Sequence, residues 1–227
     1  MKTAFRRAFF CGLAGLAAAA SAADVPVLRY EVVFKDAIMA TQTLTIAESG
    51  DLKTVTTFFE ADLPVFVALQ HYSERLSATF RADGAVERLN AVRIDGPLRT
   101  EIDGTPLTNG ALRIVRTDRA GVSTNVVARA DYDFNSLVMY GAAPADFLPA
   151  RRPARVLSVA EGLVKPTAIQ AIEESDTFER QYLKSTHLVW TDGAFTSHSW
   201  HPERFSNLPR RYVRQTASGE FTFNLIR

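Results

Sequence analysis

Four histidines are the side chains of this sequence best suited to chemistry near neutral pH: His71, His187, His198 and His201. If Asp192-Gly193 forms a two-residue turn, paired positions sum to 385 and His187 lies opposite His198, with Cβ atoms roughly 4.5–5.5 Å apart. Two opposed imidazoles can bind a transition metal or respond to pH. Without a nearby carboxylate or thiol they are too few for a stable site, and a longer turn would shift the register. We therefore predict no metal site and no cofactor.

Two pairs of carboxylates have the i, i+2 spacing that places both groups on one face of a strand, Glu60/Asp62 and Asp131/Asp133. Such pairs can serve general acid–base catalysis or bind a cation. Asp131 and Asp133 fit the start of a short helix better, because acidic side chains favour that end of the dipole. Glu60 and Asp62 fit the end of a strand that precedes Pro64. We predict no catalytic residue from either pair.

The sequence contains no recognisable nucleophile motif. It lacks a Gly-x-Ser-x-Gly elbow and a glycine-rich phosphate loop, and its only cysteine, Cys11, lies in an apolar leader. An enzyme would require His71, His187 or His198 to meet Asp131, Asp133 or Glu74 within hydrogen-bond reach.

Aromatic side chains are the most suggestive feature of the sequence. In a curved sheet with few helices they can line an apolar groove for a ligand, or they can simply form the core. The residues predicted to line such a site are Phe59, Phe66, Tyr72, Phe134 and Trp200, from a larger aromatic set that also includes Phe58, Phe80, Phe195, Phe221 and Phe223.

The elements that position these residues are predicted to be strands. Short runs of alternating apolar and polar residues recur along the chain, and no long segment has the 3.6-residue period of a helix. Gly-containing dipeptides punctuate the middle of the chain at intervals typical of hairpins: Asp83-Gly84, Asp95-Gly96, Asp103-Gly104, Asn109-Gly110 and Ala120-Gly121.

The segment 186–227 reads as an antiparallel meander of four strands, in which Phe221, Phe223 and Leu225 share one face. Asp131–Tyr140 and Thr167–Glu174 are the two candidate short helices. The predicted fold class is all-β: a single curved antiparallel sheet or half-barrel of about ten strands, with one or two short helices.

The first 23 residues have the pattern of a secretory signal peptide. Lys2, Arg6 and Arg7 precede an apolar run, Ala8–Ala20, that is too short to span a bilayer and ends in small residues. We therefore predict a signal peptide over 1–23, a single β domain over 24–227, and a periplasmic or secreted location. General secretory and twin-arginine export both remain open.

Composition excludes several classes of protein. Of 26 basic and 25 acidic residues, three basic ones lie in the leader, which leaves a net charge of about −2. Without a basic excess we expect no nucleic-acid partner. No later stretch reaches the roughly 18 apolar residues of a transmembrane helix, and no cysteine remains for a disulfide.

With these residues in view, the chain resembles a family of exported bacterial domains of unknown function, about 200 residues long. The resemblance lies in the hairpin Tyr30–Phe34 to Thr41–Ile46, the strand His71–Glu74, the step Phe134-Asn135, where the family usually has Trp, and the segment from Ser199 to Ile226. It spans nearly the whole chain after the leader, and it implies a curved antiparallel sheet similar to the lipoprotein-carrier half-barrels.

Three hypotheses about function follow. The first is a periplasmic, non-enzymatic binding or carrier module that holds an apolar ligand, a lipid or lipopeptide, in the concavity of the sheet. It predicts an open apolar cavity, on the order of several hundred Å³, rather than a filled core. The second is an envelope interaction or structural domain that pairs with a protein partner through an edge strand, and it predicts a long, uncharged edge and no cavity. The third is a hydrolase or metal enzyme built from histidine and carboxylate.

Overall fold

The structure is a computed structural model that describes residues 25–65, 68–140, 153–178, 181–191, 195–203, 208–216 and 219–226. The described residues form an all-β fold with two 3₁₀ turns, η1 (Arg129–Asp131) and η2 (Val138–Tyr140). The strands are β1 (Val27–Phe34), β2 (Ala37–Ser49), β3 (Leu52–Val65), β4 (Ala68–Arg81), β5 (Val86–Asp95), β6 (Leu98–Pro106), β7 (Leu112–Asp118), β8 (Gly121–Val127), β9 (Phe134–Asn135), β10 (Ala154–Ser158), β11 (Leu163–Phe178), β12 (Gln181–Thr191), β13 (Thr196–Pro202), β14 (Arg211–Thr216) and β15 (Gly219–Ile226).

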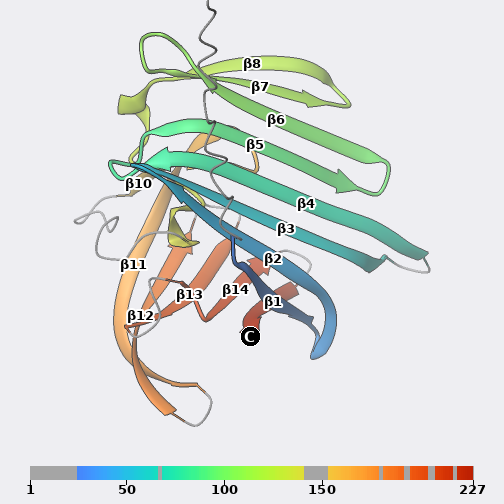
Figure 1. The fold of residues 1–227 in the computed structure, drawn as a ribbon. Helices are drawn as coiled ribbons and strands as arrows, with labels where there is room; N and C mark the ends of the chain where they lie inside the picture. The colour runs from blue at the N-terminus through green and yellow to red at the C-terminus, as the bar shows by residue number, and fades with distance from the viewer. Residues whose placement is uncertain are drawn as a thin grey trace, which may run out of the picture.

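All fifteen described strands belong to one open, curved sheet in the order β8-β7-β6-β5-β4-β3-β2-β1-β15-β14-β13-β12-β11-β10-β9. The first meander runs outward from β1 to β8, and the second returns from β9 to β15, where β15 pairs with β1 (Figure 1). Every neighbouring pair is antiparallel except β9 and β10, which are parallel. The predicted fold class is confirmed, although the strands outnumber the predicted ten and the sheet is mixed.

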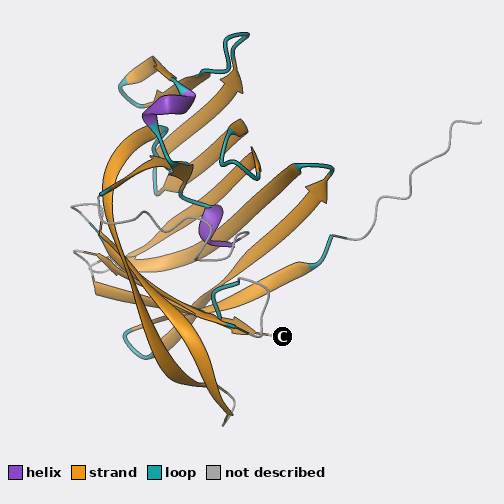
Figure 2. Cartoon of the chain, turned by 90° about the vertical axis from the view of Figure 1, so that its left-hand side faces the viewer, coloured by secondary structure: helices purple, strands orange, loops and turns teal. Residues whose placement is uncertain are grey.

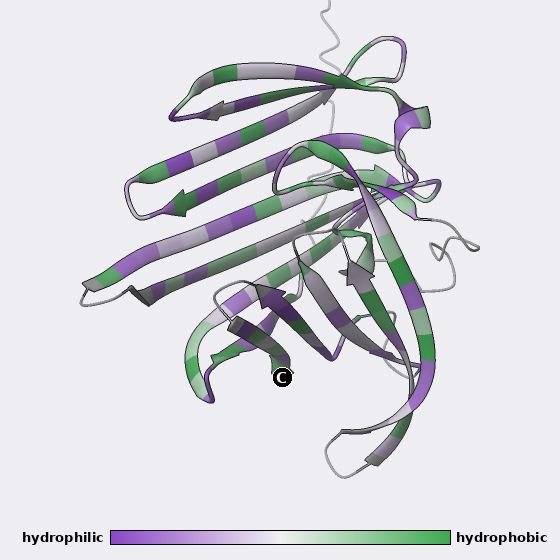
Figure 3. Cartoon of the chain, turned by 180° about the vertical axis from the view of Figure 1, so that it is seen from behind, coloured by the Kyte–Doolittle hydropathy of each residue, from purple (hydrophilic) through white to green (hydrophobic). Residues whose placement is uncertain are grey.

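The two faces of the sheet differ because apolar and polar residues alternate along the strands (Figure 3). The concave face carries buried side chains such as Tyr30, Leu44 and Val55. The outer face of β3 and β4 carries hydroxyls instead, where Thr54 and Thr79 lie 2.9 Å apart (Oγ1 to Oγ1). This alternation explains how a sheet with one apolar face can remain in water on the other.

A single core occupies the concavity. It joins residues of both meanders with the segment that crosses between them (Figure 2). From this segment Phe134, Leu137 and Tyr140 are buried. The crossing segment is anchored at the β4–β5 turn, where the backbone N–H of Val86 donates to the hydroxyl of Tyr132 at 2.9 Å. No helix among the described residues has the length and apolar character needed to cross a bilayer.

Four of the five predicted Gly turns connect strands, and the fifth is wrong. Asp103-Gly104 lies inside β6 instead of forming a turn. A Cβ added at Gly104 would lie 3.0 Å from the Leu89 side chain on β5. Glycine here permits close packing between strands rather than a turn. The turn predicted at Asp192-Gly193 lies outside the described residues.

Two further local predictions are wrong. Thr167–Glu174 was expected to be a helix but lies in β11, which pairs with β10 and β12 on its two sides. Strand β3 also continues through Pro64 to Val65 instead of ending after Asp62. In both places the pairing with neighbouring strands outweighs local propensity.

Asp131–Tyr140 contains only fragments of helix, namely the end of η1 and all of η2, separated by β9. The carboxylate of Asp131 accepts a hydrogen bond from the backbone N–H of Ala128 at 2.8 Å, and Asp133 lies 3.2 Å from a guanidinium nitrogen of Arg155. Both acidic side chains therefore hold the crossing segment in place.

Candidate ligand-binding site

Six aromatic rings form a continuous row across the concave face, which we call the aromatic ladder. Its members come from strands of both meanders and from η2: Tyr72, Phe59, Phe223, Tyr212, Tyr140 and Tyr30. Ring centroids lie 5.8 Å apart for Tyr72–Phe59 and 6.2 Å for Phe59–Phe223, and Phe223 stacks on Tyr212 at 4.0 Å. Three strand spacings separate β3 from β15, about 14 Å in a flat sheet, so the contact between Phe59 and Phe223 reflects the curvature of the sheet.

The closed end of the ladder is a cluster of three tyrosines. Tyr212 contacts Tyr30 at 5.6 Å and Tyr140 at 6.0 Å, with the rings edge to face. The Tyr30 hydroxyl donates to the Pro209 carbonyl at 2.7 Å, and the Tyr212 hydroxyl donates to the Gln42 side-chain oxygen. Burial raises the pKa of Tyr30, Tyr140 and Tyr212, so these hydroxyls stay protonated at physiological pH.

The open end of the ladder is polar. Tyr72 is half-buried, and its hydroxyl donates to Glu74 at 3.2 Å. Burial and the neighbouring Glu74 carboxylate raise the pKa of Tyr72, while the positive charges of Arg214 and Arg93 oppose that rise. Arg214 therefore lies near Tyr72 across the concavity, although its strand, β14, is five places away from β4 in the sheet.

Both arginines at this end lack a direct partner. Arg93 stands opposite Glu74 in the register, yet neither Arg93 nor Arg214 forms a hydrogen bond or an ion pair within 4.0 Å with another described residue. Arg214 is exposed to solvent and Arg93 is half-buried. Desolvation lowers the pKa of Arg214, but the nearby Glu74 carboxylate and the ladder tyrosines together outweigh this effect and raise the pKa overall. The ladder thus runs from a buried aromatic end to two guanidinium groups that form no hydrogen bond with a described residue.

The structure brings together only some of the residues predicted to line a ligand site. Phe59 and Tyr72 are neighbours in the ladder, and Phe134 is buried beside Trp190 in the core, with centroids 5.8 Å apart. Trp200 lies on the outer face, because Ser199 and His201 on either side of it point into the core. Phe66 lies outside the described residues.

Sequence reasoning missed Tyr30, Tyr140, Tyr212 and the two arginines. Tyr30 shares one face of β1 with the apolar residues Leu28 and Val32, and this pattern alone predicts that its ring is buried. No local signal predicts that Arg93 and Arg214 face the same space, since they lie more than a hundred residues apart in the chain.

His187 and His198 are in contact as predicted, although the register of β12 against β13 differs from the predicted one. Paired positions on β12 and β13 sum to 387 rather than 385, so His187 stands opposite Trp200. The faces were predicted correctly, because a shift of two residues keeps parity. His187 Nε2 lies 3.1 Å from His198 Nδ1, and the His187 ring stacks on Trp200 at 4.4 Å.

The group of His187, His198 and Trp200 on the outer face also includes one acidic residue, Glu174, and one positively charged residue, Arg211. The Trp200 indole donates to Glu174, and the Arg211 guanidinium lies 4.9 Å from the Trp200 ring centroid. Burial and the neighbouring His187 lower the pKa of His198. Within the described part of the chain, no group of three or more His, Cys, Asp or Glu side chains is arranged to hold a metal ion.

His71 lies on the outer face beside the first carboxylate pair. Its Nδ1 is 3.2 Å from Asp62, and its Nε2 is 3.9 Å from Glu60, with all three side chains largely exposed. The contacts of His71 are thus with Glu60 and Asp62, and those of His187 are with Glu174 and His198. Among the described residues, none of His71, His187 and His198 forms a hydrogen bond or ion pair with Asp131, Asp133 or Glu74, the convergence that the enzyme hypothesis requires.

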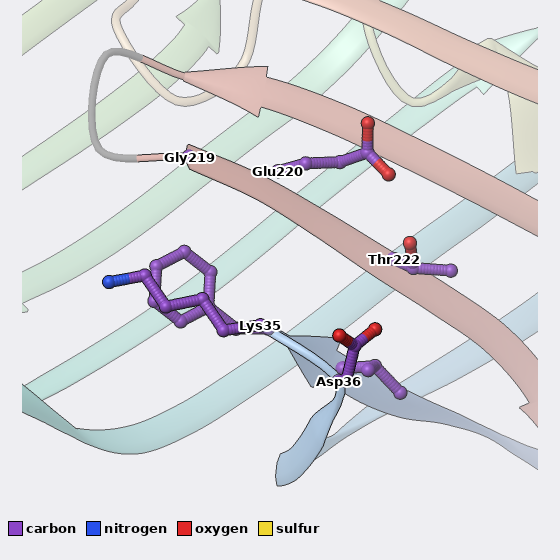
Figure 4. Close-up of a pocket in the computed structure, with 7 residues that line it drawn as sticks. Lys35, Asp36, Gly219, Glu220 and Thr222 are labelled. Carbon is purple, nitrogen blue, oxygen red and sulfur yellow. The ribbon is translucent and has the colours of Figure 1, made fainter.

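A shallow pocket of about 230 Å³ lies at the β1–β2 turn and the start of β15. The side chain of Lys35 points away from the carboxylates of Asp36 and Glu220, and Gly219 and Thr222 also line the pocket (Figure 4). This pocket is separate from the aromatic ladder and does not extend it.

No family model, curated protein or solved structure matches this chain. The resemblance to half-barrel carriers therefore stays a prediction, and function has to be inferred from the geometry itself.

Proposed function

We propose that this protein is an exported, non-enzymatic binding or carrier module for a lipid or lipopeptide held against the concave face of its sheet. The observation that carries the proposal is the aromatic ladder, which ends at Arg93 and Arg214. An apolar row that leads to two guanidinium groups without a hydrogen bond to any described residue fits an amphipathic ligand with a carboxylate or phosphate at one end.

The half-barrel shape supports the same function. The sheet is open, with β8 and β9 at its two edges, and its concavity is filled by the core, so a ligand would have to displace core side chains there. Tyr72 is only partly buried, and it marks the place where an acyl chain would enter beside Phe59. The charges at the opening are balanced by Glu74 and by Asp95, which accepts a hydrogen bond from Gln70.

The first experiment is native mass spectrometry on protein purified from the periplasm without detergent. Extra mass that disappears on organic extraction supports the proposal and identifies the ligand class. A second experiment titrates the purified protein with a dansyl-labelled undecanoic acid and with the matching alcohol. We expect saturable binding of the acid, weakened roughly tenfold by Arg93→Gln or Arg214→Gln, since a hydrogen bond to a charged group contributes about 1.5–3 kcal/mol.

Arg88→Gln is the matched control, because Arg88 is exposed on the outer face of the same strand as Arg93. If all three variants bind the acid as the wild type does, the concave arginines do not recognise the ligand. If neither the acid nor the alcohol binds and the purified protein carries no extra mass, the carrier proposal is wrong.

Pairing through an edge strand is a second candidate function, and one observation favours it. Strand β8, at one edge of the sheet, contains no charged residue and no proline. Natural edge strands usually carry such residues to prevent pairing with other chains.

A further inference from the structure

Strand β8 is an exposed and unprotected edge. Six of its seven residues are exposed, and Val122 and Val126 have 71% and 55% of their surfaces accessible. Its neighbour β7 has three charged residues in the same length, namely Arg113, Arg116 and Asp118. Charge is therefore absent from the edge of the sheet and present one strand inside it.

The opposite edge of the sheet differs. Strand β9 has only two residues, and β10 beside it carries the charged residue Arg155. Short strands and charged residues both discourage pairing with another sheet. Only one of the two described edges therefore suits an added strand.

The sequence of β8 is complementary to itself about Thr124. If two copies pair antiparallel with Thr124 opposite Thr124, then Val122 faces Val126 of the other copy and Ser123 faces Asn125. Val122, Thr124 and Val126 share one face of the strand, and Ser123 and Asn125 share the other. The five central residues thus meet partners of their own kind, branched against branched and polar against polar, while Gly121 faces Val127 at each end.

We propose that two copies of this chain associate through β8, antiparallel and about a two-fold axis at Thr124, so that their sheets become one continuous sheet. The inference rests on the edge-pairing candidate and is independent of the carrier proposal. A two-fold contact uses the same surface on both copies, and an uncharged strand meets no like charge there.

The contact is short. Seven residues extend over about 24 Å, and such a strand pair buries less surface than the roughly 1,600 Å² of a standard interface. We therefore expect a dimer that dissociates on dilution.

Cysteine cross-linking tests both the contact and its register. Once the predicted leader with Cys11 is removed, the protein contains no cysteine, so an introduced thiol has no competitor. In the proposed dimer two Thr124→Cys residues face each other at Cα distances of about 4.5–5.5 Å, within the range of a disulfide. We expect Thr124→Cys to form a covalent dimer in air.

Two controls fix the register. Val122→Cys alone should remain monomeric, because its copies lie about 14 Å apart along the strands, whereas a mixture of Val122→Cys and Val126→Cys should cross-link. Thr117→Cys, on β7, should not cross-link either, since its copies are three strand spacings apart, about 14 Å, and are also offset by about 14 Å along the strands.

Sedimentation equilibrium of the cysteine-free protein supplies the independent measurement. We expect a concentration-dependent dimer that Thr124→Lys abolishes and Thr117→Lys preserves, while binding of the dansyl acid is the same in all three proteins. A wild type that stays monomeric up to near-millimolar concentration, or a Val122→Cys protein that cross-links as readily as Thr124→Cys, overturns the proposal. Unchanged dansyl binding in such a monomer would leave the carrier function standing.

Discussion

The turn between β10 and β11 packs against strands of the other meander, and one glycine makes that packing possible. Gly162 has φ of +68°, and an added Cβ would lie 2.8 Å from Cγ2 of Ile114 and 3.0 Å from Cγ2 of Ile102. Both isoleucines are almost fully buried, so neither methyl group can move aside cheaply. We predict that Gly162→Ala destabilises the protein strongly.

The magnitude follows from two contributions. A left-handed backbone costs a residue with a Cβ about 1–2 kcal/mol, and overpacking a filled core costs about another 1–3 kcal/mol. Gly50→Ala isolates the first contribution, because Gly50 has φ of +61° and nothing within 4 Å of the added Cβ. We expect losses in the free energy of unfolding of about 3 kcal/mol for Gly162→Ala and about 1 kcal/mol for Gly50→Ala.

Urea unfolding followed by circular dichroism measures both losses. A double-mutant cycle with Ile114→Ala sharpens the result, because the Gly162→Ala penalty should shrink once the Ile114 methyl group is removed. Equal losses for Gly162→Ala and Gly50→Ala, with no coupling to Ile114, would refute the packing of this turn on β6 and β7.

Three other perturbations have clear expected outcomes. Tyr212→Phe should cost about 1–3 kcal/mol because it leaves the buried acceptor of Gln42 without its donor, whereas Tyr182→Phe, at an exposed ring, should change the urea midpoint little. Asp36→Gly should raise stability by about 0.5–1 kcal/mol in the same assay, since Asp36 has φ of +62° in a two-residue turn that favours glycine. The pKa of His198 is lowered in the folded state, so the unfolded chain binds this proton more readily. The free energy of unfolding should therefore fall as the pH drops below about 6.5, and His198→Gln should flatten this part of the pH profile.

The alternation of residues predicted much of the fold, because burial of one face acts locally. The faces of the strands around Leu44 and around Phe223 follow directly from the sequence, as do the Gly turns at the ends of β4, β5, β6 and β7. The predictions failed where distant strands decide the outcome. Gly104 is explained only by Leu89 on the neighbouring strand, and β11 is stabilised by partners on both sides.

The candidate site was predictable only in part for the same reason. Aromatic residues such as Phe59 and Tyr72 are visible in the sequence as inward-facing positions of neighbouring strands. The approach of Arg214 to Tyr72 depends on the pairing of β1 with β15 and on the curvature of the whole sheet. Neither of these has a local signature.

The pairing of β1 with β15 also determines when the sheet can be completed. A chain that leaves the ribosome or a translocation channel from its N-terminus presents β1 first, and the partner of Tyr30 and Val32 on that side is the last described strand. Until β15 arrives, an apolar strand in the middle of the future sheet has an open edge, which is the kind of surface that aggregates. The two halves of the sheet are therefore joined last, because the β1–β15 seam can form only after both meanders have been synthesised.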